Sequence, residues 1–355
     1  MAEVMEDRGD QWSLLPPELL HLIYRKLPDT GDFLRFRAVC KAWRDGAPVS
    51  DQPPQLPWIL EHRGTGLQAR QQLRFYSHSS GRMYSVRAGG RSWLLASGAC
   101  QGHAVATVDL SRTVMYNPFT GEGRALPPAP YKPWHDGVFH VVDDGEAGCL
   151  VVNTSAKTRR FAYCRPGVDA GWNVFDGRED MRHSAYHGGR FFVNTAAGET
   201  LAIEAATCAV EAVVPPPPGE NFATARGDFL VGSRGKLLRA VQHPRDGNQA
   251  ASAADYYVNM YQLDVRGGGK AAWSKVETIG DAVLFFDDHG HGFSLEPNDA
   301  AGLRRDCVYF VHEKRTWVEF CEYRFLCRYS MKDGRVDKTV QLADTFGNTW
   351  VVPSL

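Results

Sequence analysis

The sequence predicts a mainly β protein that begins with a small helical segment. Two observations carry this prediction. Residues 12–45 contain one glycine, Gly31, although the chain of 355 residues has 35 glycines, and their apolar residues recur at three- and four-residue steps. From residue 58 onward, short runs rich in β-branched and aromatic residues alternate with turn pairs such as Asn117-Pro118 and Asp246-Gly247.

The first helix is expected to start at Pro16 and Pro17, because the first turn of a helix tolerates proline. It is expected to end before Pro28, because the residue that precedes a proline is pushed out of the α region. Between these prolines the apolar residues fall on one stripe of the helix: Leu19, Leu20, Leu22, Ile23 and Leu27.

A second helix follows, with Thr30 or Asp32 as its expected cap. Its apolar residues recur at the same spacing: Phe33, Phe36, Val39, Cys40 and Trp43. A domain below about 40 residues usually needs disulfides, a metal or a partner, because it buries little surface alone. The segment therefore either caps the rest of this chain or presents its apolar side to a partner protein.

The β region repeats at roughly 40–50 residues, a length typical of the blades of a β-propeller. Each unit contains strand, turn and strand, and some end in prolines, as at Pro127-Pro128 and at residues 215–218. Dividing the remaining roughly 300 residues by about 50 predicts about six blades, with five possible. A large β-sandwich or barrel, the competing fold, would not give repeated units of this length.

The two ends of the β region are expected to meet in one blade, because an open strand edge invites aggregation. The stretch 345–352 is short, apolar and at the very end of the chain, and the early strands 73–76 and 83–86 follow the linker with no obvious preceding partner. We therefore expect Trp350 to pack between sheets in the blade that closes the ring.

Composition excludes several classes of function. The chain has 40 basic and 41 acidic residues, which argues against binding nucleic acid or acidic membranes by bulk charge. Its longest apolar run, Ala282 to Phe286, is far shorter than the ~20 residues of a membrane span. The acidic N-terminus lacks the apolar core of a secretory signal, and the eight cysteines form no Cys-x-x-Cys pair. We expect reduced thiols and a location in the cytoplasm, the nucleus or both.

Motifs for catalysis, cofactors or metals are missing from the sequence. It contains neither a Gly-x-Ser-x-Gly elbow nor a phosphate-binding glycine loop, so no cofactor is expected. The run from Asp287 to His291 comes nearest to a metal site, with His289 and His291 on one face of a strand. Its glycine favours a hairpin turn and no further ligand can be assigned, so no metal is expected either.

Aromatic residues in loops are the candidates for binding a target, because aromatic side chains bury a large area at low entropic cost. The same side chains could instead pack between blades, and the sequence leaves both interpretations open. The candidates are Tyr131, Trp134, His135, Trp172 and Phe175.

The helical segment resembles an F-box. The run WSLLPPELLHLIYRKL…DFLRFRAVCKAWR agrees with that motif at many fixed offsets. The resemblance implies binding to a Skp-type adaptor and, through it, to a cullin-based ubiquitin ligase. Residues that would contact the adaptor or form the core of the F-box are Leu15, Pro16, Leu19, Leu20, Ile23, Leu27, Val39, Cys40 and Trp43.

The remainder resembles the KIB-type, kelch-like β-propeller of a plant F-box family. The resemblance rests on the segments 117–121, 186–192, 280–286 and 307–310 and on the terminal 350–355. It implies a plant origin and a non-catalytic role as the subunit that binds a protein substrate of a ubiquitin ligase.

These observations divide the chain into four parts: a disordered acidic N-terminus (1–11), the F-box (12–45), a proline-rich linker (46–57) and the propeller (58–355). The linker is either a stiff spacer or an ordinary surface loop. The alternative function is a propeller-fold hydrolase or carbohydrate-active enzyme with an incidental helical cap. Such an enzyme would need convergent carboxylates or a catalytic triad, and the sequence displays neither.

Overall fold

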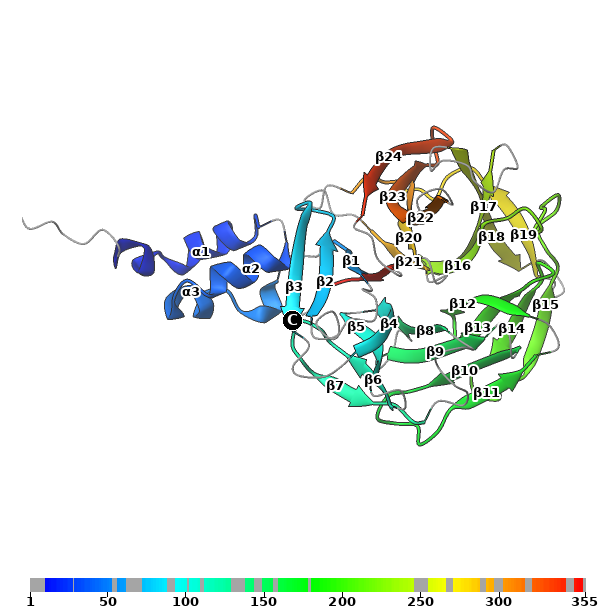
Figure 1. Ribbon diagram of the computed structural model, residues 1–355, viewed down its shortest axis with the longest axis horizontal. Coiled ribbons are helices and arrows are strands. Elements are labelled where there is room, and N and C mark those ends of the chain that lie inside the picture. The colour runs from blue at the N-terminus through cyan, green and yellow to red at the C-terminus, as the bar shows by residue number, and fades with distance from the viewer. Residues whose placement is uncertain are drawn as a thin grey trace, which may run out of the picture.

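A helical segment is followed by a ring of β-sheets in the computed structural model of the protein (Figure 1). The helical segment comprises η1 (Asp10–Leu14), α1 (Pro17–Tyr24), α2 (Thr30–Arg37), α3 (Lys41–Asp45) and η2 (Val49–Asp51). The structure describes residues 10–27, 29–52, 56–61, 72–87, 93–100, 102–108, 112–128, 138–143, 149–155, 159–177, 180–245, 255–265, 271–287, 292–296, 303–316, 321–342 and 348–353.

The helices differ from expectation at four points. The expected second helix is two helices, since α2 ends at Arg37 and α3 begins at Lys41 after an extended Cys40. Asp10 and Gln11, which the sequence places in a disordered stretch, belong to η1; residues 1–9 lie outside the described residues. Helix α1 ends at Tyr24, because the amides of Lys26 and Leu27 bond three residues back instead of four and so form a tighter turn. Asp29, and neither Thr30 nor Asp32, is the N-cap of α2, and its Oδ1 accepts a hydrogen bond from the amide of Asp32 at 2.9 Å.

The described strands form six sheets, listed here in the spatial order of their strands. The first sheet holds β25 (Asn348–Val351), β1 (Trp58–Glu61), β2 (Gln72–Ser77) and β3 (Arg82–Arg87). The second holds β4 (Trp93–Cys100), β5 (His103–Val108), β6 (Arg112–Tyr116) and β7 (Gly123–Ala125). The third holds β11 (Asn173–Asp176), β10 (Arg160–Cys164), β9 (Cys149–Ser155) and β8 (Val138–Asp143).

The fourth sheet holds β12 (Met181–His187), β13 (Arg190–Thr195), β14 (Thr200–Glu204) and β15 (Val210–Val214). The fifth holds β16 (Gly227–Ser233), β17 (Lys236–Pro244), β18 (Tyr256–Val265) and β19 (Ala271–Val276). The sixth holds β21 (Gly292–Leu295), β20 (Val283–Phe286), β22 (Cys307–Thr316), β23 (Cys321–Ser330) and β24 (Arg335–Gln341). Its strands β20 and β22 run parallel, a feature that the sequence repeat does not predict.

Apolar clusters fill the spaces between successive sheets and close the ring. Each of six clusters joins residues of two neighbouring sheets, including the pair formed by the sixth and the first. Adjacent residues on one strand alternate between two clusters: Phe191 faces the third sheet and Phe192 the fifth. Both faces of a sheet are therefore buried, which explains why its strands read as unbroken apolar runs. The predicted β-propeller is confirmed. The described strands form six sheets, and both six and five blades lie within the prediction.

The predicted meeting of the two ends is also confirmed by strand pairing. Ile59 of β1 lies opposite Trp350 of β25, and β1 also pairs with β2, so the first sheet is the closing sheet of the ring. The side chain of Trp350 is buried, and its Nε1 donates a hydrogen bond to the carbonyl oxygen of Phe286 at 2.9 Å. This bond links the closing sheet to the sixth sheet.

The linker is bound to its neighbours rather than free. The hydroxyl of Tyr24 donates a hydrogen bond to Asp51 at 3.0 Å, and Nε2 of Gln52 donates one to the hydroxyl of Thr30 at 2.9 Å. Leu56 and Pro57 are buried, and residues 53–55 lie outside the described residues. Among the helices that the structure describes, none combines the length and the apolar character needed to span a membrane.

Candidate functional site

The helical segment has a small apolar core of its own. Leu20 and Tyr24 of α1 pack with Phe33 and Phe36 of α2, and the ring of Trp43 lies with its centroid 4.5 Å from that of Phe36. The indole nitrogen of Trp43 donates a hydrogen bond to the carbonyl oxygen of residue 12 at 2.8 Å, which ties η1 to α3. This core fixes which sides of the helices face outward.

Large apolar side chains are exposed around this core. On α1, Leu19 is 45% exposed, Leu22 58% and Ile23 37%, and their three- and four-residue spacing places them on one side of the helix. Val39, beyond the end of α2, is 58% exposed. We define the apolar face of the helical segment as the following residues: Trp12, Leu14, Leu19, Leu22, Ile23, Leu34 and Val39.

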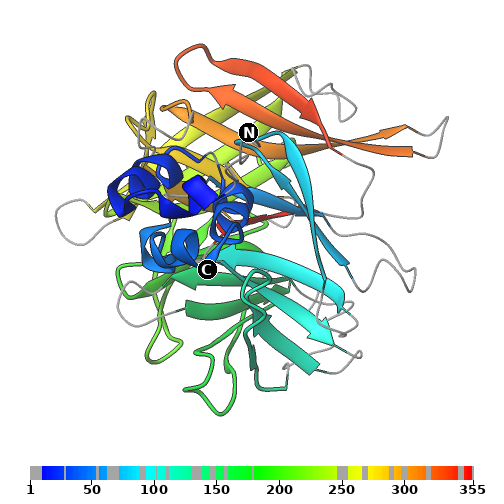
Figure 2. The same ribbon diagram turned by 90° about the vertical axis from the view of Figure 1, so that its left-hand side faces the viewer.

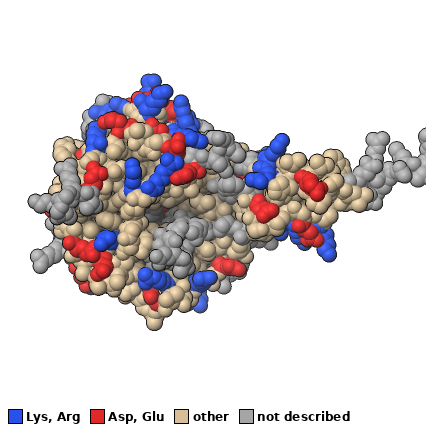
Figure 3. Space-filling model, turned by 180° about the vertical axis from the view of Figure 1, so that it is seen from behind, with Lys and Arg blue, Asp and Glu red and all other residues tan. Residues whose placement is uncertain are grey.

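Such exposure is concentrated in this part of the protein. The propeller exposes other large apolar side chains among its described residues, but these are single valines and a methionine: Met83, Val168, Val174, Val210 and Val213. Scattered surface apolar residues are ordinary, whereas a cluster of leucine, isoleucine and tryptophan on a short segment indicates a surface that a partner covers. Figure 3 shows acidic and basic groups both on the helical segment, at its right, and over the propeller, so the concentration of exposed apolar side chains, and not a lack of charge, distinguishes the helical segment.

The structure places some of the nine sequence-predicted residues in the core of the helical segment and others at its surface. Leu20 is buried in the core, and Leu15, Leu27 and Trp43 pack against it. The residues that remain available for contact are Pro16, Leu19, Ile23 and Val39, with Cys40 half-buried. The sequence-predicted site omits Trp12, Leu14, Leu22 and Leu34, although the position of Leu22, three residues after Leu19, signals that it shares their side of α1.

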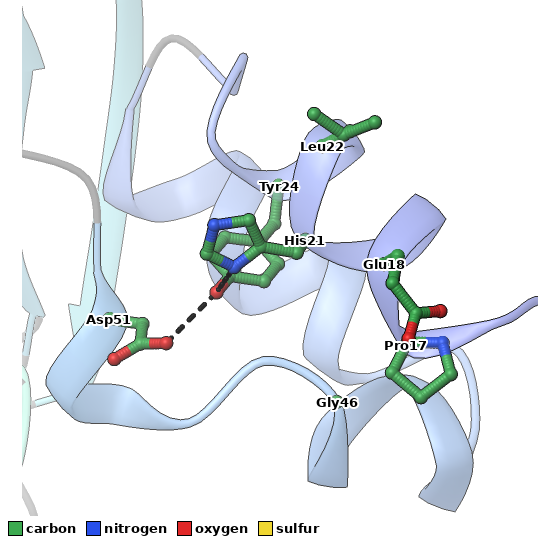
Figure 4. Close-up of a pocket in the computed structure, with 7 residues that line it drawn as sticks. All are labelled: Pro17, Glu18, His21, Leu22, Tyr24, Gly46 and Asp51. Carbon is green, nitrogen blue, oxygen red and sulfur yellow. Dashed lines mark hydrogen bonds between the residues drawn. The ribbon is translucent and has the colours of Figure 1, made fainter.

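An open hollow of about 510 Å³ lies beside the apolar face, between α1 and the linker (Figure 4). Within it, Nδ1 of His21 lies 2.6 Å from the hydroxyl of Tyr24, which donates to Asp51 at 3.0 Å. Burial, and then the hydrogen bond to Asp51, raise the pKa of Tyr24 above its ordinary value. The tyrosine therefore stays protonated, and the bond fastens the linker to α1.

The loop aromatics are only partly tested by the structure, since Tyr131, Trp134 and His135 lie outside the described residues. Trp172 is half-buried, with its Nε1 donating to the carbonyl oxygen of Pro127 at 3.1 Å and its ring near Phe139.

Phe175 is also half-buried, and it packs against the cluster between the third and fourth sheets. Both described side chains thus occupy packing positions, as the second interpretation of these residues requires.

The candidate metal run lies largely outside the described residues as well: Asp287 is described and buried, whereas residues 288–291 are not described. Among the residues that the structure does describe, there is no group of three or more His, Cys, Asp and Glu side chains able to hold a metal ion.

A second cluster of polar side chains, which no sequence motif predicted, surrounds Glu220 in the loop before β16. Its carboxylate accepts hydrogen bonds from Nδ2 of Asn259 at 2.5 Å and from the hydroxyl of Tyr261, and it lies 2.6 Å from Nε2 of His243. The side chains of Glu220 and His243 are only 3% and 5% exposed. A carboxylate and a histidine so placed could serve catalysis, but here they are buried and bonded, and they tie the loop to β17 and β18.

This cluster predicts an acid-dependent loss of stability. Burial alone would raise the pKa of Glu220, but the hydrogen bonds from His243, Tyr261 and Asn259 lower it below its ordinary value of 4.5. A lowered folded-state pKa stabilises the protein above the pKa of the unfolded chain, and this gain is lost as pH falls through the folded value. We expect urea midpoints of the wild type to fall more steeply below pH 4.5 than those of Glu220→Gln. If the urea midpoints of the two proteins fell equally with pH, the lowered pKa of Glu220 would be contradicted.

Comparison with known families agrees with this architecture. An F-box-like family model matches residues 12–47, and a model of the KIB1-4 beta-propeller matches residues 71–333, well over half of the chain. The chain belongs to the KIB1-4 beta-propeller family. Its F-box places it with a class of proteins that generally bind Skp-type adaptors, and F-box and propeller together are typical of non-catalytic substrate adaptors.

Curated relatives of this family member come from Arabidopsis thaliana. An F-box protein is 37% identical over 59 residues, and an F-box/kelch-repeat protein is 49% identical over 37 residues. The first match covers 16% of this chain and 16% of the relative, and the second covers 10% of each. The similarity to these proteins is therefore limited to a small part of their length.

Solved structures with a similar fold are much more distant. The β-propeller domain of Cps50 (Swd1) from Myceliophteria thermophila is 8% identical, with a TM-score of 0.40 over 80% of this chain and 85% of that one. Hydrazine synthase of Kuenenia stuttgartiensis is 9% identical, with a TM-score of 0.38 over 77% of this chain and 81% of that one. With TM-scores below 0.5, these two structures support no inference about this chain.

Proposed function

We propose that this protein is the substrate-recognition subunit of a Skp–cullin–F-box ubiquitin ligase. The apolar face of the helical segment binds a Skp-type adaptor, and the propeller binds the protein that is to be ubiquitinated. The protein itself supplies no catalytic group in this proposal and works in the cytoplasm, the nucleus or both.

The observation that carries the proposal is the exposure of apolar side chains on an F-box whose core is already complete. Leu19 and Ile23 are not needed to hold α1 in place, because Leu20 and Tyr24 do so. Burying a leucine side chain of this kind against a partner contributes about 1.5–3 kcal/mol. A face of seven such residues is therefore suited to a protein interface with an apolar centre.

We expect Leu19→Asp to weaken capture of the adaptor by about 30-fold or more, because truncating a central interface residue costs about 2 kcal/mol and a buried, unpaired carboxylate costs more. Pro16→Ala should weaken it less. The measurement is the dissociation constant of the full chain for a purified Skp-type adaptor, with thermal unfolding recorded in parallel.

Val213→Asp is the matched control, because Val213 is also exposed but lies on the outer strand β15 of the propeller. It should bind the adaptor like the wild type. Unchanged affinity of Leu19→Asp, with both variants folded, would refute the adaptor role of the apolar face.

A further inference from the structure

The helical segment is joined to the closing sheet by a buried carboxylate. Asp29, the N-cap of α2, is 1% exposed, and its Oδ2 accepts hydrogen bonds from the hydroxyls of Ser77 at 3.2 Å and Tyr84 at 2.8 Å. Its other oxygen, Oδ1, caps the amide of Asp32. One side chain therefore caps the start of α2 and binds two strands, β2 and β3, of the propeller.

Tyr84 is enclosed on several sides at this joint. Its ring stacks on Trp58 with centroids 4.6 Å apart and planes 9° apart, while the guanidinium of Arg35 lies 5.4 Å from the ring centroid. A Cβ placed on Gly31 would lie 2.5 Å from Cε1 of the Tyr84 ring. Helix α2 therefore approaches this ring so closely that a residue with a side chain at position 31 would push the ring aside. Gly31, the single glycine of residues 12–45, is thus explained by packing and not by helix formation.

Further polar contacts flank the joint. Arg82 of β3 lies 3.3 Å from the carboxylate of Asp32, and Gln52 of the linker donates to Thr30, which is fully buried. Burial would raise the pKa of Asp29, but the hydrogen bonds that it accepts lower it below its ordinary value. Asp29 therefore stays ionised at neutral pH. Figure 1 shows the helices beyond β3, on the outer side of the closing sheet, and Figure 2 shows them from that side, in front of the ring.

We propose that Asp29, Gly31 and Tyr84 form a rigid joint that holds the helical segment at one fixed orientation on the propeller. These are positioning residues, since none of them belongs to the apolar face. The biological meaning of the joint rests on the proposed function: a fixed orientation sets where a protein bound to the propeller lies relative to the adaptor. A proline-rich linker alone would not fix this orientation, because it restrains the distance between the helical segment and the propeller but lets one rotate relative to the other.

The test measures the orientation directly, in the full-length protein without adaptor. Spin labels are introduced as unnatural amino acids at Lys41 of α3 and Lys332 of the β23–β24 turn, both exposed, so that the native cysteines stay unlabelled. Pulsed electron spin resonance then gives the distribution of distances. We expect one narrow peak for the wild type.

The test variant is Asp29→Ser combined with Gly31→Ala. Serine still caps α2 but is too short to reach both Ser77 and Tyr84, and alanine favours the helix while its Cβ displaces the ring of Tyr84. We expect the peak to shift and broaden. Gly171→Ala is the matched control, because a Cβ at Gly171 meets nothing within 4 Å. It should reproduce the wild-type peak.

A second label pair, Glu122 and Lys332, reports on the propeller alone and should give the same narrow peak in every variant. A broad wild-type distribution for the Lys41–Lys332 pair would overturn the proposal, and so would a test variant with the wild-type peak. Because the measurement contains no adaptor, it is independent of the Leu19→Asp experiment. If the joint is refuted, the Leu19→Asp experiment still tests adaptor binding, and if adaptor binding is refuted, the distance measurement still tests the joint.

Discussion

Replacement of Arg239 by methionine should destabilise the protein by about 3–5 kcal/mol, because it leaves the buried carboxylate of Asp228 without its charged partner and, among the described residues, with only the hydrogen bond from Asn194. Arg239 is fully buried, and its Nε and Nη2 donate to the two oxygens of Asp228 at 2.7 and 2.8 Å. Its Nη1 donates to the carbonyl oxygen of Gly198 in the fourth sheet at 2.8 Å. The guanidinium also lies over the ring of Phe222, 4.5 Å from its centroid.

The comparison variant for this prediction is Arg190→Met, which removes an exposed ion pair with Glu211 and should cost about 1 kcal/mol or less. The measurement is the free energy of unfolding by denaturant. A double variant with Asp228→Leu should lose less than the sum of the two single losses, because the second change removes the unpaired charge. A loss for Arg239→Met no larger than that for Arg190→Met would show that the buried pair contributes little.

We expect Trp350→Ala to cost about 3–5 kcal/mol, the usual range for truncating a buried tryptophan. The substitution leaves a cavity beside Phe285, whose ring meets the indole edge to face at 5.0 Å, and it leaves the carbonyl oxygen of Phe286 without its donor. Deletion of residues 348–355 should have a larger effect, because it removes β25 and exposes the edge of β1. Deletion of residues 1–45 removes no strand and should leave the propeller soluble.

Urea unfolding of Trp350→Ala, and limited proteolysis of the two deletions, measure these effects. Val213→Ala is the control for the point variant, because Val213 is exposed and should cost no more than about 0.5 kcal/mol. A C-terminal deletion that stays soluble and unfolds cooperatively would contradict the role of β25 in holding the ring closed.

Leu19 and Leu20 show which part of the candidate site could be predicted from the sequence and which part could not. Helical spacing places both on one apolar stripe, and the motif resemblance includes both. Only the packing of Leu20 against Phe33 and Phe36 shows that it belongs to the core while Leu19 faces outward. Periodicity identifies a face, but it does not say how much of that face the chain itself covers.

The propeller was predictable for a related reason. Strands that are buried on both faces have short apolar runs in their sequence, and the regular spacing of these runs indicates the repeated blades. The presence of β25 in one sheet with the early strands β2 and β3 followed from the need to close the ring, but β1, which lies between β25 and β2 and pairs with Trp350, was not among the predicted strands. The joint at Asp29 did not follow, because Tyr84 lies 55 positions away and its hydroxyl is indistinguishable in sequence from any other. Arg239 was unpredictable for the same reason, since its partners come from two sheets.

The composition of the closing sheet has a consequence for synthesis of the chain on the ribosome. Strands β1 to β3 emerge early, but their inner neighbour β25 is the last strand to be made. At about 5–20 residues per second, the residues between β1 and β25 take roughly 15–60 s to translate. During that interval the helices can already fold while the ring stays open. A transcript with a premature stop codon between positions 52 and 348 would thus encode an intact helical segment and an incomplete propeller. Under the proposed function, such a chain would bind the adaptor without delivering a target.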